Sequence, residues 1–215
     1  MLAINTAFLT ANLALESSSG VFTKTLDAKS KHSENVLKNI DELCKEANID
    51  ILDVDTVAVV TGPGSFTGLR IGVAIAKALG CVNKNLKFVS VSSLELMAYI
   101  VAKNRLNQGQ DFVCVLNALS NFYFVGYFDK NGTKLKSETM VEKEVYDQIT
   151  VQKFGLAGDL EGLQTVEISS LDLLKFAKTK HEFISEKELL PLYLRPSQAE
   201  SDLLLKNTKK DTKNS

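Results

Sequence analysis

The part of the sequence most informative about the fold reads Gly62-Pro63-Gly64-Ser65-Phe66-Thr67-Gly68-Leu69-Arg70-Ile71-Gly72. The compact β-branched run at 56–60 precedes it and predicts a buried strand, while apolar residues recur with helical spacing over 67–80. A strand that leads through a glycine-rich loop into a helix is typical of α/β proteins. The sequence therefore predicts an α/β fold, with this loop at the end of a strand.

The loop has the composition of an anion site but lacks the motifs of one. Free N–H groups at a helix start can hold a phosphate. No Gly-Lys-Ser/Thr follows, however, and Thr67 stands where the dinucleotide fingerprint needs glycine. The spacing around Ser65 also misses a nucleophile elbow by one residue. We therefore expect a structural loop, in which Ser65 or Thr67 caps the helix. Its residues are Gly62, Pro63, Gly64, Ser65, Phe66 and Thr67.

The helix that follows has two apolar surfaces. Between Gly68 and Gly80 only Arg70 and Lys77 are polar, and they share one narrow sector. One apolar face comprises Ile71, Ala74, Ile75 and Ala78, and a flatter ridge beside it comprises Gly68, Gly72, Ala76 and Leu79. One surface packs on the chain's own sheet, and the other is either covered by the same chain or offered to a partner helix. If the ridge meets a partner, Ala76 lies near solvent in the free chain.

The first half of the chain has the pattern of a meander followed by helices and strands. The strands are expected at 1–7, 11–16, 21–27, 56–60 and 86–90. An amphipathic helix is expected over Ser33–Ala47, and a capping box of Ser92 and Glu95 opens a third helix.

The second half repeats this beginning. Beyond a linker at 104–109, strands are expected at 112–117 and 122–128, followed by a hairpin turn with an Asn-Gly step at 131–132. Asn5 and Asn117 both end a first strand, Gly20 and Gly132 both sit in a following turn, and each pair is 112 residues apart (117 − 5 and 132 − 20). This offset indicates an internal duplication, although chance similarity of two meanders is the alternative. We expect lobes at 1–104 and 105–205, and a disordered basic tail at 206–215.

The composition excludes several classes of protein. A net charge of −1 gives no field that would draw the chain to nucleic acid or membrane, so contact with RNA must be local or borrowed from a partner. The three cysteines form no C-x-x-C pair and the two histidines no metal-binding motif, so we expect neither disulfides nor a bound metal. The apolar start lacks the cationic region of a signal peptide, and no run could span a bilayer, which favours the cytoplasm.

The eleven-residue string from Gly62 to Gly72 closely resembles the signature of the TsaB (YeaZ) family. Three further strings resemble motifs of that family and come in the same order. They are His32-Ser33-Glu34, Val91-Ser92-Ser93-Leu94-Glu95 and Pro191-Leu192-Tyr193-Leu194-Arg195-Pro196-Ser197. The resemblance spans nearly the whole chain.

The resemblance implies an actin-like ATPase (ASKHA, ribonuclease H-like) fold of two related lobes, without chemistry or a cofactor of its own. Such a subunit supports a TsaD-type paralogue that forms N6-threonylcarbamoyladenosine in tRNAs reading ANN codons, and a TsaE-type ATPase joins the assembly. It also implies that tRNA is contacted only through the complex and that the chain alone can pair with itself. The implied partner interface comprises His32, Ser33, Val36, Leu37, Ile40, Gly68, Leu69, Gly72, Val73 and Ala76.

Two positions depart from the family pattern. Asn5 stands where Ile-Asp-Thr is usual, and Asn117-Ala118-Leu119 stands where Met-Asp-Ala-Arg is usual. Both departures remove carboxylates that a sugar-kinase-like enzyme would use to hold Mg²⁺. The loss of these carboxylates favours a scaffold over the alternative function, an ATP-dependent kinase or hydrolase of the same fold. The fold alone does not decide between the two functions.

Overall fold

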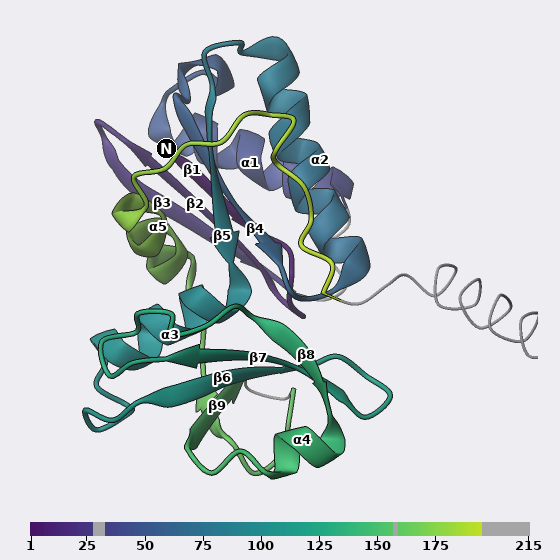
Figure 1. Ribbon diagram of the computed structural model, residues 1–215. Helices are drawn as coiled ribbons and strands as arrows, with labels where there is room; N and C mark the ends of the chain where they lie inside the picture. The colour runs from purple at the N-terminus through teal and green to yellow at the C-terminus, as the bar shows by residue number, and fades with distance from the viewer. Residues whose placement is uncertain (28–32, 157–158, 195–215) are drawn as a thin grey trace, which may run out of the picture.

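The computed structural model describes residues 1–27, 33–156 and 159–194, which form two five-stranded sheets with helices (Figure 1). The predicted α/β class is therefore confirmed. None of the helices in these three ranges is long and apolar enough to cross a membrane.

The first sheet begins with the predicted meander. It contains β1 (Leu2–Asn5), β2 (Ala11–Ser17), β3 (Gly20–Leu26), β4 (Thr56–Gly62) and β5 (Lys87–Ser92). The first three strands pair antiparallel, with Ile4 opposite Leu13, and β4 and β5 run parallel to β1 in the order β3-β2-β1-β4-β5. Because β1 and β4 are buried on both faces, they read as continuous apolar runs.

The second sheet repeats this plan. It contains β6 (Phe112–Asn117), β7 (Phe122–Phe128), β8 (Thr139–Glu142), β9 (Gln152–Leu156) and β10 (Gln164–Val166). Their order is β10-β9-β6-β7-β8, so β6 to β10 occupy the places of β1 to β5, with the same parallel and antiparallel neighbours. Asn5 and Asn117 both end the central strand. The repeated order confirms the actin-like fold with two related lobes.

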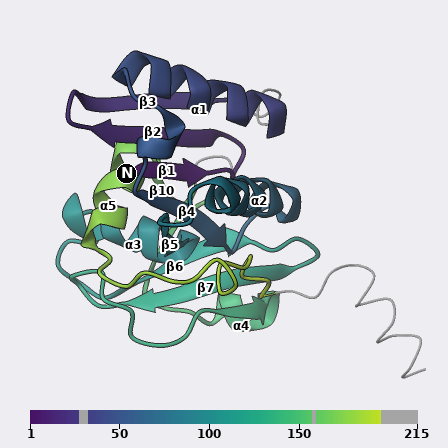
Figure 2. The same cartoon turned by 90° about the horizontal axis from the view of Figure 1, so that it is seen from above.

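Two helices cover one face of the first sheet, as Figure 2 shows from above. They are α1 (Ser33–Ala47), in the predicted place, and α2 (Phe66–Val82), with the short 3₁₀ turn η1 (Ile51–Asp53) between them in sequence. Val36, Ile40 and Leu43 of α1 share a core with Ile4 and Val59 of the sheet. In the second lobe only the short helix α4 (Lys143–Asp147) stands at the place of α1, and residues 159–163 form no counterpart of α2.

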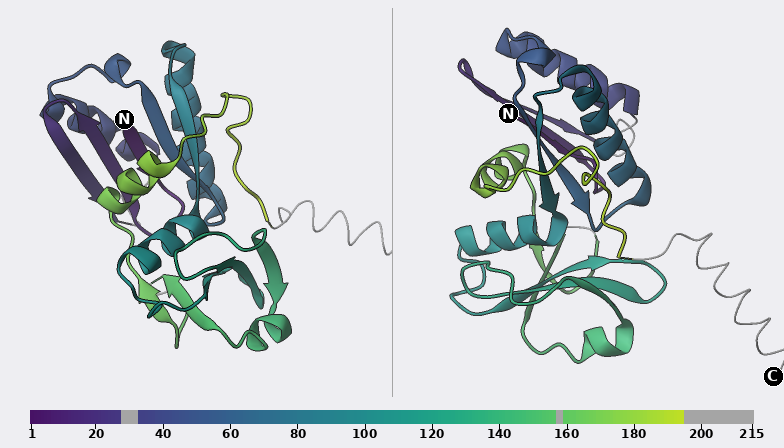
Figure 3. Two further views of the ribbon diagram at one scale, coloured as in Figure 1. Left: turned by 60° about the vertical axis from the view of Figure 1, so that its left-hand side comes forward. Right: turned by 45° about the horizontal axis from the view of Figure 1, so that its top comes forward.

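The other face of the first sheet meets the second lobe through α3 (Ser93–Lys103) and α5 (Ser170–Thr179). Figure 3 shows α5 on the opposite side of the sheet from α1 and α2. The helix α5 packs on β1, β2 and β3 although it follows the second sheet in sequence, and α3 contacts strands of both sheets. One core cluster consequently joins the lobes, and the boundary expected at residue 104 stays a prediction.

The predicted capping box is half formed. Ser92 is the N-cap of α3, and its hydroxyl accepts a hydrogen bond from the backbone N–H of Glu95. The carboxylate of Glu95 does not complete the box but accepts hydrogen bonds from Lys134, at 2.6 Å, and from Lys180. Two lysines from distant segments compete successfully for this carboxylate because charged donors bind it more strongly than a backbone N–H.

Candidate functional site

The glycine-rich loop packs tightly against the end of β1. Ser65 caps α2, since its hydroxyl accepts from the N–H of Gly68 at 3.3 Å, and its own N–H donates to the carbonyl of Ala7 at 2.8 Å. A Cβ at Gly64 would lie 2.7 Å from the Ala7 carbonyl oxygen, and a Cβ at Gly68 would overlap that of Thr6. Because these glycines have no Cβ, a neighbouring backbone segment approaches them closely. In a phosphate-binding loop that space would be left for the ligand.

The C-terminal segment lies over this loop. The N–H of Leu192 donates to the carbonyl of Thr61 at 2.7 Å. The ring of Tyr193 lies 4.7 Å from that of Phe66, while Arg70 stacks over Phe66 at 3.9 Å and donates from Nε to the Tyr193 hydroxyl at 3.0 Å. We call Phe66, Arg70 and Tyr193 the clasp. Of the motif at 191–197, residues 195–197 lie outside the described part of the chain.

The structure buries most residues of the interface implied by the resemblance. The buried members are Val36, Ile40, Gly68, Leu69, Gly72, Val73 and Ala76. Among the apolar residues of this implied interface, Leu37 alone is strongly exposed, with a relative solvent exposure of 47%. His32 lies outside the described residues, and Ser33 is the first residue of α1. Which of these residues meet a partner stays a prediction.

The expectation that Ala76 lies near solvent in the free chain is wrong, because Ala76 is 0% exposed. The ridge turns towards the chain's own sheet: a Cβ at Gly72 would lie 2.6 Å from the Thr6 hydroxyl oxygen and 3.2 Å from a methyl group of Val59. Small residues along the ridge let α2 lie close to β1 and β4. Of the two alternatives that the sequence leaves open, the same chain covers this ridge.

A different stripe of α2 faces outward. Arg70, Ala74 and Ala78 are exposed, and α1 presents Leu37 on the same side of the sheet. We call Leu37, Arg70, Ala74 and Ala78 the outer face. The signal that could have found it was the polar sector of Arg70 and Lys77, which marks the side of the helix away from the sheet.

The two asparagines at the strand ends, Asn5 and Asn117, have the same local structural role. The side-chain oxygen of Asn5 accepts the N–H of Ala7 at 3.0 Å, and that of Asn117 accepts the N–H of Leu119 at 2.8 Å. Each amide therefore closes a turn after its strand. In the described part of the chain, no three metal-ligating side chains of the His, Cys, Asp and Glu types come together.

A cleft of about 1290 Å³ lies between the lobes, lined from the turn after β1, β2, the glycine-rich loop, β6, the start of α5 and the C-terminal segment. Its acidic side chains include Asp159 and Asp172. Burial raises the pKa of Asp159 above its usual value, against a hydrogen bond from the N–H of Asn117. Burial also acts to raise the pKa of Asp172, but hydrogen bonds from Ser169 and Lys103 outweigh it and lower that pKa. No pattern along the chain indicates this cleft, because its walls come from distant segments.

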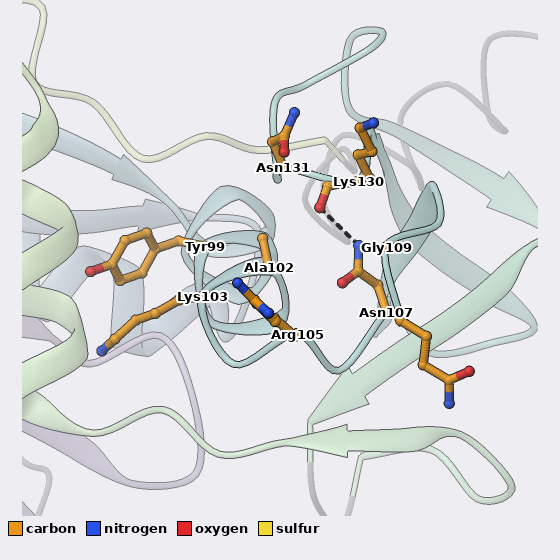
Figure 4. A pocket seen from close by; sticks show the side chains of 9 residues that line it. Tyr99, Ala102, Lys103, Arg105, Asn107, Gly109, Lys130 and Asn131 are labelled. Atoms are coloured by element: carbon orange, nitrogen blue, oxygen red, sulfur yellow. Dashed lines mark hydrogen bonds between the residues drawn. The ribbon is translucent and has the colours of Figure 1, made fainter.

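A smaller hollow of about 660 Å³ lies at the end of α3 (Figure 4). The buried amide of Asn107 donates there to the carbonyls of Gln110, at 2.7 Å, and Lys130, at 2.9 Å. These bonds fasten the predicted linker to the hairpin turn at 129–132. Lys103, which also lines the hollow, is paired with Asp172 at 3.1 Å.

A protein-family model and several known proteins are similar to this chain. The protein-family model described as TsaD, tRNA N6-adenosine threonylcarbamoyltransferase, matches residues 17–182. A protein of Buchnera aphidicola (subsp. Schizaphis graminum), named tRNA threonylcarbamoyladenosine biosynthesis protein TsaB, is 26% identical over 89% of this chain and 91% of its own length. The TsaB protein of Escherichia coli is 32% identical over 46% of this chain and 42% of its own.

A solved structure shares the fold. YeaZ from Pseudomonas aeruginosa superposes with a TM-score of 0.70 at 20% identity, over 89% of this chain and 98% of that one. The family model covers well over half of the chain, and the first relative matches it nearly from end to end. The chain therefore belongs to the TsaB (YeaZ) family of tRNA threonylcarbamoyladenosine biosynthesis proteins, within the wider family that the TsaD model describes.

Proposed function

We propose that this chain is a non-catalytic scaffold subunit in the formation of N6-threonylcarbamoyladenosine in tRNA, and that it binds and supports a TsaD-type transferase. The observation that carries the proposal is the pair of neutral amides, Asn5 and Asn117, at the two strand ends where an enzyme of this fold would need carboxylates. Both amide oxygens are occupied in closing turns. The close packing of the loop glycines Gly64 and Gly68 against the backbone of Ala7 and Thr6 supports the same proposal.

The partner surface that we propose is the outer face of α1 and α2. Leu37 is an exposed leucine on a helix that otherwise buries its apolar residues, and Ala74 and Ala78 leave the neighbouring surface flat. Flat apolar helix surfaces with an arginine at the edge suit close packing by a partner helix. A TsaD-type protein is the natural partner, because the TsaD family model matches this chain and implies a related fold.

Two further parts of the assembly rest on the family resemblance. A TsaE-type ATPase joins the pair, and tRNA is contacted through the transferase, since this chain has a net charge of −1. In the absence of the transferase, the outer face pairs with that of a second copy. Equilibrium sedimentation of the chain alone and with the paralogue tests this competition: the self-paired species should disappear as the paralogue is added.

The direct test is reconstitution of the modification reaction. We expect tRNA threonylcarbamoylation to require this chain together with the TsaD-type and TsaE-type proteins, and the isolated chain to neither turn over ATP nor modify tRNA. The alternative function, an ATP-dependent kinase or hydrolase, predicts the opposite for the isolated chain. Magnesium-dependent ATP binding at micromolar concentration with turnover by this chain alone would overturn the scaffold proposal.

A further inference from the structure

The cleft between the lobes has a chemical character that does not suit a polyanion. Most of its lining is apolar, including Leu69, Leu116, Phe124 and Val166. Three carboxylates line it as well, those of Asp159, Glu167 and Asp172, and none of the described lining residues is a lysine or arginine. An apolar cleft with acidic side chains favours an occupant that is itself apolar and basic.

One wall of the cleft carries an unused hydrogen-bond acceptor. Asn12 lines the cleft at 3% exposure, and its Oδ1 has no partner among the described residues. Its Nδ2 makes one long contact, 3.5 Å, with the hydroxyl of Thr25. Buried polar atoms are nearly always hydrogen-bonded, so this oxygen indicates a donor that the described residues do not supply.

The chain itself leads a suitable segment to the mouth of this cleft. Leu192, Tyr193 and Leu194 line the cleft and end the described part of the chain, beside the clasp. The sequence continues as Arg-Pro-Ser-Gln-Ala-Glu-Ser-Asp and then Leu203-Leu204-Leu205-Lys206, with Lys209 and Lys210 shortly after. Eight residues lie between Leu194 and Leu203, and an extended chain of that length reaches up to about 30 Å.

We propose that the C-terminal segment docks in the interlobe cleft of its own chain. The leucine triplet fills the apolar part, the lysines that follow it lie near the carboxylates, and an N–H group of the segment donates to Asn12 Oδ1. The segment therefore matches the cleft in apolar character, in charge and in the distance that it can span. Because the segment is tethered at the rim, its effective concentration is millimolar, so a weak contact suffices to hold it. The inference does not depend on the proposed function.

Zero-length cross-linking of the full chain tests the docking. A carbodiimide joins a lysine to a carboxylate only when the two are in contact, and peptide mapping then identifies the pairs. We expect cross-links from Lys206, Lys209 or Lys210 to Asp159, Glu167 or Asp172. Replacing Leu203, Leu204 and Leu205 together by Ser should reduce them at least fivefold and increase the fluorescence of a dye that binds apolar surfaces. A matched triple variant, Asn207→Ser, Thr208→Ser and Thr212→Ser, should leave both signals unchanged.

Other occupants are separate outcomes of the same test. In a mixture of ¹⁴N- and ¹⁵N-labelled chains, cross-links between the two isotopes would place the segment in the cleft of a second copy and overturn the proposal. Equal cross-linking in the leucine variant would overturn it too. Hydrogen exchange gives a third outcome. If ATP and Mg²⁺ protect the amides of Leu116 and Asn117 while the leucine variant leaves their exchange unchanged, the cleft is a nucleotide site and the proposal is overturned.

Discussion

Asn5 and Asn117, 112 residues apart in sequence, accept a hydrogen bond from the backbone N–H two residues further on, in the same place of two related sheets. The two amides differ in their surroundings: Asn5 is 0% exposed and its Nδ2 has no partner among the described residues, whereas Asn117 is exposed. A carboxylate at either position would keep the acceptor for the turn. Only at Asn5 would it bury a negative charge whose second oxygen, at the place of Nδ2, has no hydrogen-bond partner among the described residues.

Asn5→Asp should therefore destabilise the fold by about 2 kcal/mol or more at pH 7, since an unpaired buried charge is costly. Asn117→Asp, the matched control in the second lobe, should cost about 0.5 kcal/mol or less. Urea denaturation of both variants measures this difference. Equal effects at the two positions would show that burial does not separate them.

Ala76→Glu should prevent folding or cost about 3–5 kcal/mol, because the carboxylate would be forced between α2 and its own sheet. Ala74→Glu, two residues away on the exposed side of the same helix, should leave the melting temperature nearly unchanged. Circular dichroism with thermal melting distinguishes the pair. A stable Ala76→Glu chain would mean that α2 is oriented differently on the sheet.

Gly64→Ala should cost about 1–3 kcal/mol through its close approach to the Ala7 carbonyl. The reason is not a left-handed backbone: the positive φ in this loop, +128°, belongs to Gly62. Gly109→Ala is a useful control, since it has a φ of +76° but no neighbour within 4 Å of an added Cβ. Its cost should be the conformational one of about 1 kcal/mol, and it should not disturb the loop. Urea denaturation of the two variants measures these costs, and a crystal structure of the Gly64 variant shows whether the loop has moved.

Two glutamates at the junction of the lobes should have opposite effects on the pH dependence of stability. Burial acts to raise the pKa of Glu95, but hydrogen bonds from Lys134 and Lys180 outweigh it, so the pKa is lowered. Its contribution is present above the unfolded pKa of about 4.3 and is lost as the pH falls through the folded value. Burial raises the pKa of Glu138, despite a hydrogen bond from Ser92, so its contribution is present at low pH and lost as the pH rises.

Glu95→Gln should accordingly lower the free energy of unfolding by about 1–3 kcal/mol at pH 7 and by less at pH 3. Glu138→Gln, which keeps the acceptor for Ser92, should be neutral or stabilising at pH 7 and without effect at pH 3. Denaturation curves of both variants at the two pH values are the measurement. A loss of stability at pH 7 in the Glu138 variant would contradict the assigned direction.

The sequence was most informative where structure is local. The strand, loop and helix around Gly62–Gly68 follow from residues that are neighbours in the chain, and the constant offset between Asn5 and Asn117 revealed the repeated sheet. The orientation of α2 could not be derived in this way. Helical spacing defines two apolar faces, but the contact of Gly72 with Thr6 that chooses between them joins segments far apart in sequence.

The cleft and its acceptor were beyond sequence reasoning for the same reason. Asn12, Leu116 and Leu194 meet only because two sheets and a C-terminal segment converge, and no spacing along the chain records this. Glu95 shows the converse: its local motif predicts a capping box, and two lysines 39 and 85 residues away take its carboxylate instead.

Binding of the TsaD-type paralogue to variants of the outer face tests the scaffold proposal. Leu37→Glu and Ala74→Glu place a charge on this face, whereas Leu171→Glu, a leucine of α5 with 39% exposure against 47% for Leu37, places the same charge on the opposite side of the sheet. By light scattering after size exclusion, the wild type and Leu171→Glu should form the complex. Leu37→Glu and Ala74→Glu should remain folded and unbound, with affinity reduced at least a hundredfold. Normal binding by both outer-face variants, or a loss of binding only in Leu171→Glu, would show that the transferase does not bind the outer face.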